Sequence, residues 1–163
     1  MKRLILMRHA KSSWGDPDEP DHDRPLNRRG QHSAEALGGW LRDNNYRPDQ
    51  VLSSTATRTR ETLDRVRLTA QAEFVDALYL AGAERMLAVL RQAKGDSVLM
   101  LGHNPGIAGL AQALVVPPPD HSRFFDYPTC ATLVANFEIA DWADLAPGTG
   151  RVRDFVIPRE LTG

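Results

Sequence analysis

The chain has 163 residues, of which 42% are hydrophobic and 25% charged, and its formal net charge is −1 at pH 7. This composition is typical of a globular domain and argues against intrinsic disorder, while the near-zero net charge gives no global electrostatic reason to bind nucleic acid or an anionic membrane. Because Cys130 is the single cysteine, an intrachain disulfide and a cysteine-built metal site are excluded.

The length fits one domain, and no linker or repeat interrupts the pattern, so we expect a single domain over residues 1–163. No apolar stretch is long enough to cross a bilayer. The first residues lack the long hydrophobic region and cleavage site of a signal peptide. We therefore expect a cytoplasmic protein with neither membrane nor nucleic-acid partners.

The first half of the chain alternates short apolar runs with amphipathic segments. Residues 3–8 predict a strand, and their four central residues are all apolar, as in a strand covered on both faces. A polar loop is expected over 12–27, followed by a helix over 28–45 with an apolar stripe. A short strand at 50–53 and a helix at 56–69 come next.

The same alternation continues in the next part of the chain. We expect a third strand at 73–75 and a helix over 84–94 that ends with Gly95 after its last turn. Residues 97–101 predict a buried strand. Asn104 is then expected to cap a helix over 105–114, which has proline at its first position.

The last third of the chain has a different character. A proline-rich loop is expected over 116–128, a strand over 131–139, turns over 140–150 and a final strand over 151–157. Because strands alternate with helices through most of the chain, the sequence predicts an α/β fold: a three-layer α/β/α sandwich with a mainly parallel central sheet.

Arginine and histidine residues follow three of the predicted strands. Arg8 and His9 come at the end of the first strand, and Arg58 lies in the first turn of the helix after the second. His103 follows the strand at 97–101. Because ligands of open α/β sheets bind at the carboxyl ends of strands, these side chains are expected to meet. An arginine at a helix N-terminus, added to free N–H groups, favours an oxyanion there.

Other interpretations of these residues stay open at this point. A histidine can be a nucleophile, an acid or base, or a metal ligand, and an isolated arginine is more often a solvated surface residue. A metal would need further ligands, and the acidic segment 21–23 lies in a polar loop and is interpreted as solvated, so no metal is expected. No role is assigned to the remaining histidines, His22, His32 and His121.

Four segments, in order along the chain, resemble the motifs of the histidine phosphatase superfamily, which has the phosphoglycerate mutase-like fold. Residues 6–10 (Leu-Met-Arg-His-Ala) resemble its R-H-G signature, and 24–30 resemble its P-L-T-x-x-G segment. Residues 53–62 resemble S-P-x-x-R-x-x-Q-T, and 102–106 (Gly-His-Asn-Pro-Gly) resemble the second-histidine motif. The small size and the R-H-A-K-S-S-W and G-H-N-P-G segments resemble the SixA-type phosphohistidine phosphatase branch.

The resemblance implies a role for each residue that matches these motifs. His9 would be the nucleophile that becomes phosphorylated, and Arg8, Arg58 and a protonated His103 would surround the phosphoryl oxygens. Phosphoryl transfer needs mainly positioning and charge stabilisation, which these groups can supply without a metal or cofactor. Further contacts to phosphate or substrate are expected from Lys11, Ser12 and Asn104.

The general acid that larger members of the family use has no clear counterpart. Asp76 and Glu84 follow the third strand and are the candidates, beside the carboxylates of residues 16–23. A phosphoramidate needs less acid assistance than an alkyl ester, because imidazole is the better leaving group. The resemblance therefore implies hydrolysis of phosphohistidine in proteins, with inorganic phosphate as product. The alternatives are a phosphomonoesterase acting on small phosphate esters and a catalytically silent phosphate-binding module.

Overall fold

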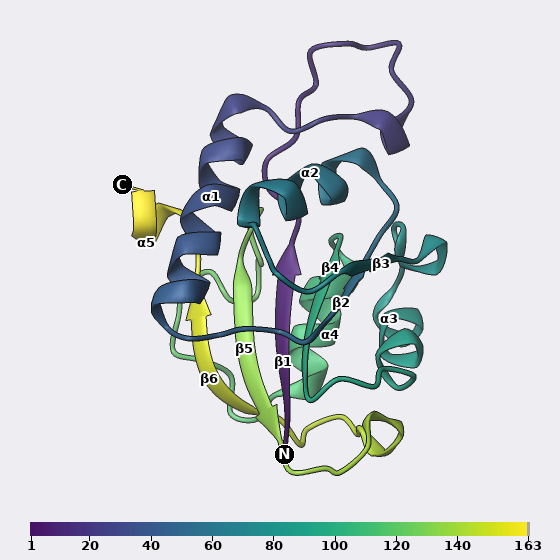
Figure 1. Cartoon of the computed structure of the whole chain (residues 1–163), viewed down its shortest axis with the longest axis vertical. Coiled ribbons are helices and arrows are strands. Elements are labelled where there is room, and N and C mark those ends of the chain that lie inside the picture. The colour runs from purple at the N-terminus through teal and green to yellow at the C-terminus, as the bar shows by residue number, and fades with distance from the viewer. Residues whose placement is uncertain (163) are drawn as a thin grey trace.

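A six-stranded sheet forms the centre of the computed structural model, which describes residues 1–162 (Figure 1). The order across the sheet is β3-β2-β4-β1-β5-β6. The first four strands in this order run parallel, and β5 and β6 run antiparallel to their neighbours. The strands are β1 (Lys2–Arg8), β2 (Gln50–Ser53), β3 (Ala72–Phe74), β4 (Ser97–Gly102), β5 (Thr132–Phe137) and β6 (Arg151–Val156).

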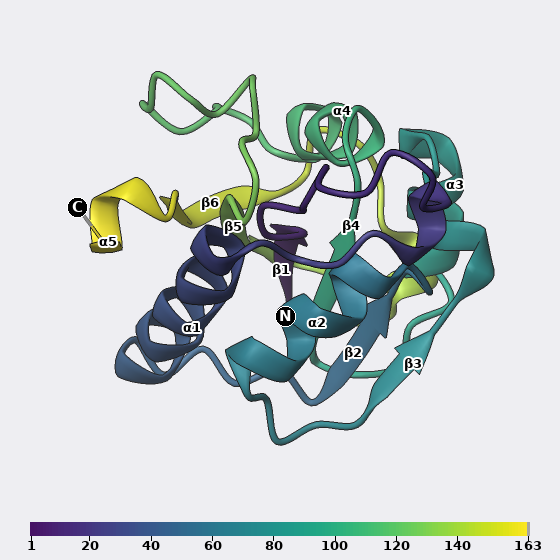
Figure 2. The ribbon, with the colours of Figure 1, turned by 90° about the horizontal axis from the view of Figure 1, so that it is seen from above.

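Helices cover both faces of this sheet, as the view from above shows (Figure 2). Helices α1 (Arg28–Asp43) and α2 (Thr57–Val66) pack together on one face. Helices α3 (Ala83–Leu90) and α4 (Gly106–Leu114) pack together on the other. The prediction of a three-layer α/β/α sandwich with a mainly parallel sheet is therefore confirmed. Within residues 1–162, no helix combines the length and apolarity that crossing a bilayer requires.

The continuous apolar run of β1 is explained by its central place between the two helical layers. Leu4 and Leu6 belong to the hydrophobic cluster under α3 and α4, whereas Ile5 and Met7 belong to the cluster under α1 and α2. All four side chains are fully buried. Alternate residues of a strand point to opposite faces, so a strand with both faces covered has no place for a polar side chain before its end.

Helix α3 and its predicted end differ from the sequence-based expectation. It ends at Leu90 instead of residue 94, so Gly95 is not its terminating residue. The side chain of Gln50 accepts hydrogen bonds from the backbone N–H groups of Lys94 and Gly95 (both 2.8 Å). A Cβ at Gly95 would lie 2.1 Å from Asp49 Oδ1, so this glycine permits a close approach to the start of β2.

Smaller differences concern short elements. The short helix α5 (Arg159–Thr162) follows β6 and was not predicted. The predicted loop over 116–128 contains no helix or strand. It is nevertheless anchored in the core by the fully buried Phe124 and Tyr127, and the Tyr127 hydroxyl donates to the Leu6 carbonyl. This loop therefore has a defined place beside the carboxyl end of β1.

Candidate active site

The carboxyl ends of β1 and β4 bring the two motif histidines side by side. Arg8 and Gly102 are partners in the parallel register of these strands, and the His9 N–H donates to the Gly102 carbonyl (3.1 Å). The residue that follows each of these strands is a histidine, and the ring centroids of His9 and His103 are 5.2 Å apart. Parallel pairing of two separate motifs thus determines the distance between the two imidazoles.

A pocket of about 340 Å³ opens at this edge of the sheet. It is lined by Arg8, His9, Arg58 and His103, the four residues that were expected to meet because they follow the carboxyl ends of strands. The other predicted contact residues, Lys11, Ser12 and Asn104, line it as well. Among the remaining lining residues, Asp21 was considered only as one of the loop carboxylates of residues 16–23, and the sequence gave no site role to Trp14, Arg24, Leu80 and Thr129.

His9 is held in one orientation and in one protonation state. Its Nδ1 lies 2.7 Å from the Ala10 carbonyl, which can only accept, so Nδ1 carries the proton and Nε2 keeps a lone pair. Burial, together with the charges of Arg8 and Arg58, lowers the pKa of His9 to about 3. The imidazole is therefore neutral at neutral pH and can act as a nucleophile through Nε2.

His103 differs from the expectation that it is protonated. Its Nε2 lies 2.8 Å from the Ser54 hydroxyl oxygen, and only 2% of the residue is exposed. Burial, with the positive charge of Arg58, lowers the pKa of His103 to about 4, so the ring is neutral at neutral pH. A nearby anion favours the protonated form of a histidine, so a phosphoryl group beside this ring would raise the pKa again.

The two arginines differ in burial: Arg58 is buried and Arg8 is half-buried. Arg8 donates to the Tyr127 carbonyl (3.2 Å), and burial with the charge of Arg58 lowers its pKa. Arg58, which is 2% exposed, lies in the first turn of α2, where a cation opposes the helix dipole. Three buried nitrogen atoms of pocket residues, Arg8 Nε, Arg58 Nε and His103 Nδ1, have no hydrogen-bond partner within residues 1–162. Such groups are uncommon in folded proteins and often mark functional sites.

Asp21 lines this pocket, which the sequence did not predict, although the segment 21–23 is otherwise solvated as expected: Asp21 and Asp23 are both exposed. Arg58 donates to the Asp21 carbonyl (2.8 Å) and to its carboxylate (3.1 Å). The Tyr79 hydroxyl and Arg24 also donate to this carboxylate. Burial raises the pKa of Asp21, but hydrogen bonds from Tyr79 and Arg58 outweigh burial and lower the pKa to about 2. Asp21 is thus ionised at neutral pH.

The two carboxylates proposed as general acids do not line the pocket. Asp76 begins a 3-10 turn after β3 and is exposed, and Glu84 is exposed in the first turn of α3. The carboxylate that does line it, Asp21, is deprotonated and has no proton to donate. Within residues 1–162, no group of three or more His, Cys, Asp or Glu side chains could hold a metal ion.

The loop after β1 forms the rim of the pocket through contacts between its own residues. Arg24 donates to the Ser12 hydroxyl (2.6 Å), and its guanidinium carbon lies 3.6 Å from the centroid of the Trp14 ring. Trp14 is 77% exposed, although Arg24 is 7% exposed. Arg24 begins the segment 24–30 that resembles a family motif. The sequence of that segment does not indicate that the Arg24 side chain points back to the pocket.

Asn104 is not the N-cap residue of α4, although its side chain accepts a hydrogen bond from the first turn of that helix as a cap would. Helix α4 begins at Gly106, one residue later than expected. The Asn104 amide group donates to the carbonyls of Asp126 (2.9 Å) and Tyr127 (3.1 Å), and its oxygen accepts from the Ala108 N–H (3.2 Å). Asn104 therefore ties the loop over 116–128 to α4 at the pocket edge.

Comparisons with known proteins agree with the fold. Residues 4–79 match the model of the histidine phosphatase superfamily (branch 1). An uncharacterized protein of Mycobacterium tuberculosis (strain H37Rv) is 37% identical over 161 residues, which cover 94% of this chain and all of that protein. The chain therefore belongs to the histidine phosphatase superfamily, and its fold is phosphoglycerate mutase-like.

Within this superfamily, the chain is similar to SixA proteins. SixA from Nakamurella multipartitia is 31% identical, with 96% of each chain covered and a TM-score of 0.84. SixA from Agrobacterium tumefaciens is also 31% identical, with 96% of this chain and 99% of that chain covered and a TM-score of 0.78. The recognition of a SixA-like branch from the motifs is thus confirmed, and it supports a phosphatase activity.

Proposed function

We propose that this protein is a metal-independent phosphatase that hydrolyses phosphohistidine in proteins through a phosphohistidine intermediate on His9. The observation that carries the proposal is the state of His9, a neutral imidazole with a free Nε2 lone pair in a pocket that also contains two arginines. An oxyanion pocket with a neutral nitrogen nucleophile is suited to phosphoryl transfer.

The first step transfers the phosphoryl group from the substrate to the enzyme. His9 Nε2 attacks phosphorus in line with the leaving nitrogen, so one N–P bond forms as the other breaks. The substrate imidazole leaves with the bonding electron pair and takes a proton from water. Arg8 and Arg58 stabilise the equatorial oxygens, and His103 becomes protonated beside the dianion.

The second step regenerates the enzyme. A water molecule attacks the phosphorus of phospho-His9, the N–P bond breaks, and inorganic phosphate leaves the pocket. The electron pair of the N–P bond returns to Nε2, so His9 is neutral again with its proton on Nδ1, and the proton released by the water passes to the phosphate. The Ala10 carbonyl keeps the Nδ1 proton in place during both steps, which preserves the orientation of the ring.

The proposed preference for phosphohistidine over alkyl phosphates follows from the positions and protonation of the carboxylates. Asp21 is ionised, and Asp76 and Glu84 lie outside the pocket, so no carboxylic acid is positioned to protonate an alkoxide. Imidazole leaves readily without such help, and this favours phosphohistidine over an alkyl phosphate. One structural relative is the protein histidine phosphatase SixA complexed with tungstate, an oxyanion (23% identity, TM-score 0.75). Its ligand is consistent with the oxyanion pocket proposed for this chain.

The test compares three substrates at equal concentration: a phosphohistidine peptide, an aryl phosphate and an alkyl phosphate. We expect kcat/KM to be highest for the peptide and lowest for the alkyl phosphate. Equal values for all three would favour the phosphomonoesterase alternative, and turnover of none would favour the silent binding module. Activity in EDTA should equal activity without it. Loss of activity in EDTA that Mg²⁺ or Zn²⁺ restores would contradict the metal-independent mechanism.

A further inference from the structure

A second hollow adjoins the phosphate pocket and shares Lys11 and Thr129 with it. Its volume is about 550 Å³, and it lies between the start of α1, the segment before β5 and the connection from β6 to α5. Its charged lining residues are all basic: Lys11, Arg29, Arg123 and Arg159. The hollow therefore extends the oxyanion pocket into a wider region of positive charge.

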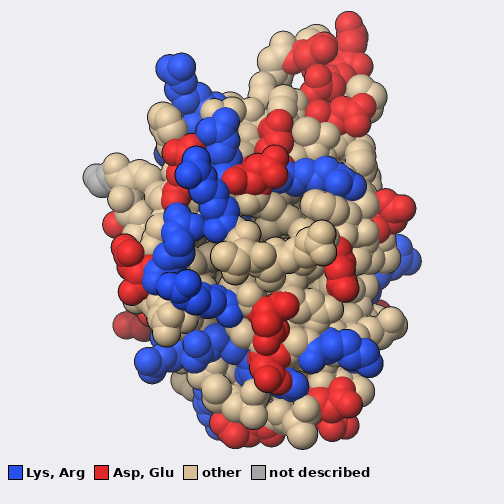
Figure 3. Space-filling view, in the orientation of Figure 1, with Lys and Arg blue, Asp and Glu red and all other residues tan. Residues whose placement is uncertain are grey.

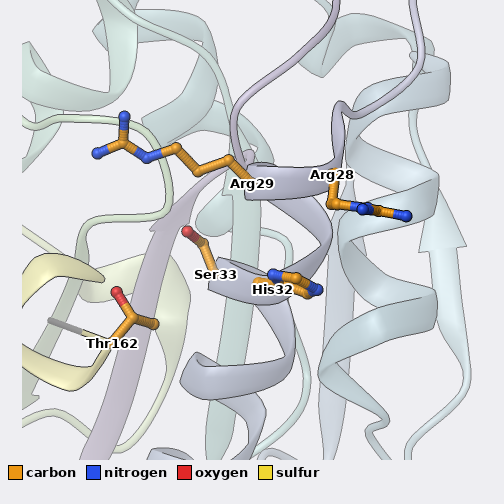
Figure 4. Close-up of a pocket in the computed structure, with 5 residues that line it drawn as sticks. All are labelled: Arg28, Arg29, His32, Ser33 and Thr162. Carbon is orange, nitrogen blue, oxygen red and sulfur yellow. The ribbon is translucent and has the colours of Figure 1, made fainter.

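A third hollow, of about 430 Å³, continues from the second and shares Arg29, Ser33 and Thr162 with it. In Figure 4, the Arg29 side chain extends from α1 over the space between Ser33 and Thr162, whereas Arg28 and His32 point to the other side of the helix. We call the two hollows together the basic groove, defined by Lys11, Arg29, Ser33, Arg123, Arg159 and Thr162.

Neighbouring carboxylates leave much of this positive charge uncompensated. Asp126 forms an ion pair with Arg123 (3.0 Å). The Glu160 carboxylate contacts His121 (2.9 Å) and accepts a hydrogen bond from a backbone N–H. No carboxylate of residues 1–162 forms an ion pair with Lys11, Arg29 or Arg159. The groove thus carries a local excess of positive charge on a chain whose net charge is −1.

The position of Arg29 is unfavourable for the helix that carries it. Arg28 and Arg29 are the first two residues of α1, and the first turn contains no acidic residue. A helix N-terminus has partial positive charge, so cations there destabilise the helix and anions stabilise it. Helix stability therefore does not explain Arg29, whereas attraction of an anion to the groove does.

The opposite side of the phosphate pocket has the opposite charge. The loop between β1 and α1 contains five carboxylates, Asp16, Asp18, Glu19, Asp21 and Asp23. Figure 3 shows acidic residues gathered at the top right of the molecule, where Figure 1 places this loop, and basic residues at the top left, over α1. A substrate with negative charge beside its phosphoryl group is therefore directed toward α1 and away from the loop.

We propose that the basic groove binds carboxylates that flank the phosphohistidine of a protein substrate, so that the preferred substrate presents an acidic segment. This inference rests on the proposed function and names its substrate class. The cations come from four separate chain segments that all line the second hollow, and Arg29 also reaches the third. Such a spread matches several carboxylates along a polypeptide better than the single carboxylate of a small ester.

The experiment uses three phosphohistidine peptides that differ only in their flanking residues: glutamate, glutamine or lysine. At low salt, we expect kcat/KM to be about 10-fold higher for the glutamate peptide than for the glutamine peptide, as a few exposed ion pairs would give. The lysine peptide should be the slowest. High salt should reduce the differences, because exposed charges are screened.

Variants assign the effect to the groove. In the double variant Arg29→Gln/Arg159→Gln, the ratio of kcat/KM between glutamate and glutamine peptides should fall to about 2 or less. The matched control is Arg85→Gln, an exposed arginine on α3 that lines none of these hollows. The control should keep the ratio of the unmodified protein. A ratio that is the same in all three proteins would overturn the proposal.

Two further comparisons distinguish a failure of the groove proposal from a failure of the proposed function. If phosphohistidine peptides are cleaved without regard to flanking charge, the groove proposal fails and the proposed function stands. If no phosphohistidine peptide is cleaved but an aryl phosphate is, the proposed function fails. Fluorescence anisotropy with the unphosphorylated glutamate peptide then tests the groove, and binding unaffected by Arg29→Gln/Arg159→Gln would overturn it. Phosphoserine differs from phosphoethanolamine by a carboxylate. Faster cleavage of phosphoserine, without a preference among the peptides, would indicate that the groove binds a small carboxylate substrate and not an acidic segment of a protein.

Discussion

The phosphate pocket and its rim are built in different ways. In the pocket, Arg8, His9 and His103 lie at or next to the ends of paired strands, so the backbone of the sheet positions them. On the rim, Trp14 and Arg24 are held by contacts within one long loop, and Asp21 is held by Arg24 of that loop and by Arg58 and Tyr79 outside it. If the protein acts as proposed, the reacting groups are positioned by the sheet, whereas the choice of substrate depends on loops that can change without disturbing it.

The largest effect on activity is expected when the proposed nucleophile is removed from the pocket. His9→Ala should reduce turnover by roughly 10⁴-fold or more and abolish the phosphoenzyme, because no other side chain of the pocket replaces a positioned nucleophile. Label from the unmodified enzyme should be lost in acid and kept in alkali, as expected of an N-linked phosphate. Acid-stable label, or label that persists in His9→Ala, would place the covalent step on another residue.

Removing a cation from the pocket should have the next largest effect. Arg58→Ala should lower kcat by roughly 10²- to 10³-fold, as expected for a group that stabilises charge in the transition state. Arg85→Ala is the matched control and should have no effect, because Arg85 is exposed and lies outside the pocket. Steady-state kinetics measures both. Near-normal kcat in Arg58→Ala would show that Arg8 and His103 suffice.

The stability of the protein should depend on pH through the two buried histidines. Their pKa values are about 3 and about 4 in the folded chain, below the usual 6.5, so the unfolded state binds more protons between pH 6.5 and these values. Stability is therefore fully present above about pH 6.5 and falls as the pH decreases toward 4. At pH 4.5, each histidine should cost on the order of 2 kcal/mol.

Denaturant unfolding at pH 7 and pH 4.5 measures this dependence. His9→Asn, which removes one titrating group, should lose part of the difference between the two pH values. Asp21 has a lowered pKa of about 2, so its contribution is lost only at lower pH, between about 4 and 2. An unfolding free energy that is equal at pH 7 and pH 4.5 would contradict the neutral, buried histidines.

A smaller change should sharpen the distinction between pocket and rim. Asp21 places a negative charge on Arg58, so it competes with an incoming phosphoryl group for the same guanidinium. Asp21→Asn should therefore tighten the binding of inorganic phosphate by about 5-fold, a modest effect because Asp21 is partly exposed. Isothermal titration calorimetry measures the Kd. Weaker binding would show instead that Asp21 is needed to position Arg58.

The smallest effects are expected at the two predicted acids. Asp76→Asn and Glu84→Gln should change kcat/KM by no more than about 2-fold for any substrate, because both side chains are exposed and neither lines the pocket. Kinetics with phosphohistidine and alkyl phosphate peptides checks this. A large loss confined to the alkyl ester would identify one of them as a general acid despite its position.

Much of the fold and the centre of the pocket could be predicted from the sequence because the signals are local. The apolar run of β1, followed at once by Arg8 and His9, specifies a buried strand with its chemistry at the carboxyl end. The same pattern recurs at β4 and His103. Parallel strands share one edge, so two local patterns were enough to predict one site.

Other features were decided by the tertiary structure alone. The contact between Asp21 and Arg58 joins residues 37 positions apart, and no periodicity encodes it. The neutral state of His103 depends on burial and on the charge of Arg58, neither of which a motif contains. After the end of α3 at Leu90, the N–H groups of Lys94 and Gly95 donate to Gln50, which lies more than forty positions away in the chain. Local patterns specify secondary structure, whereas pKa values, ion pairs and helix ends depend on which distant residues fill the remaining space.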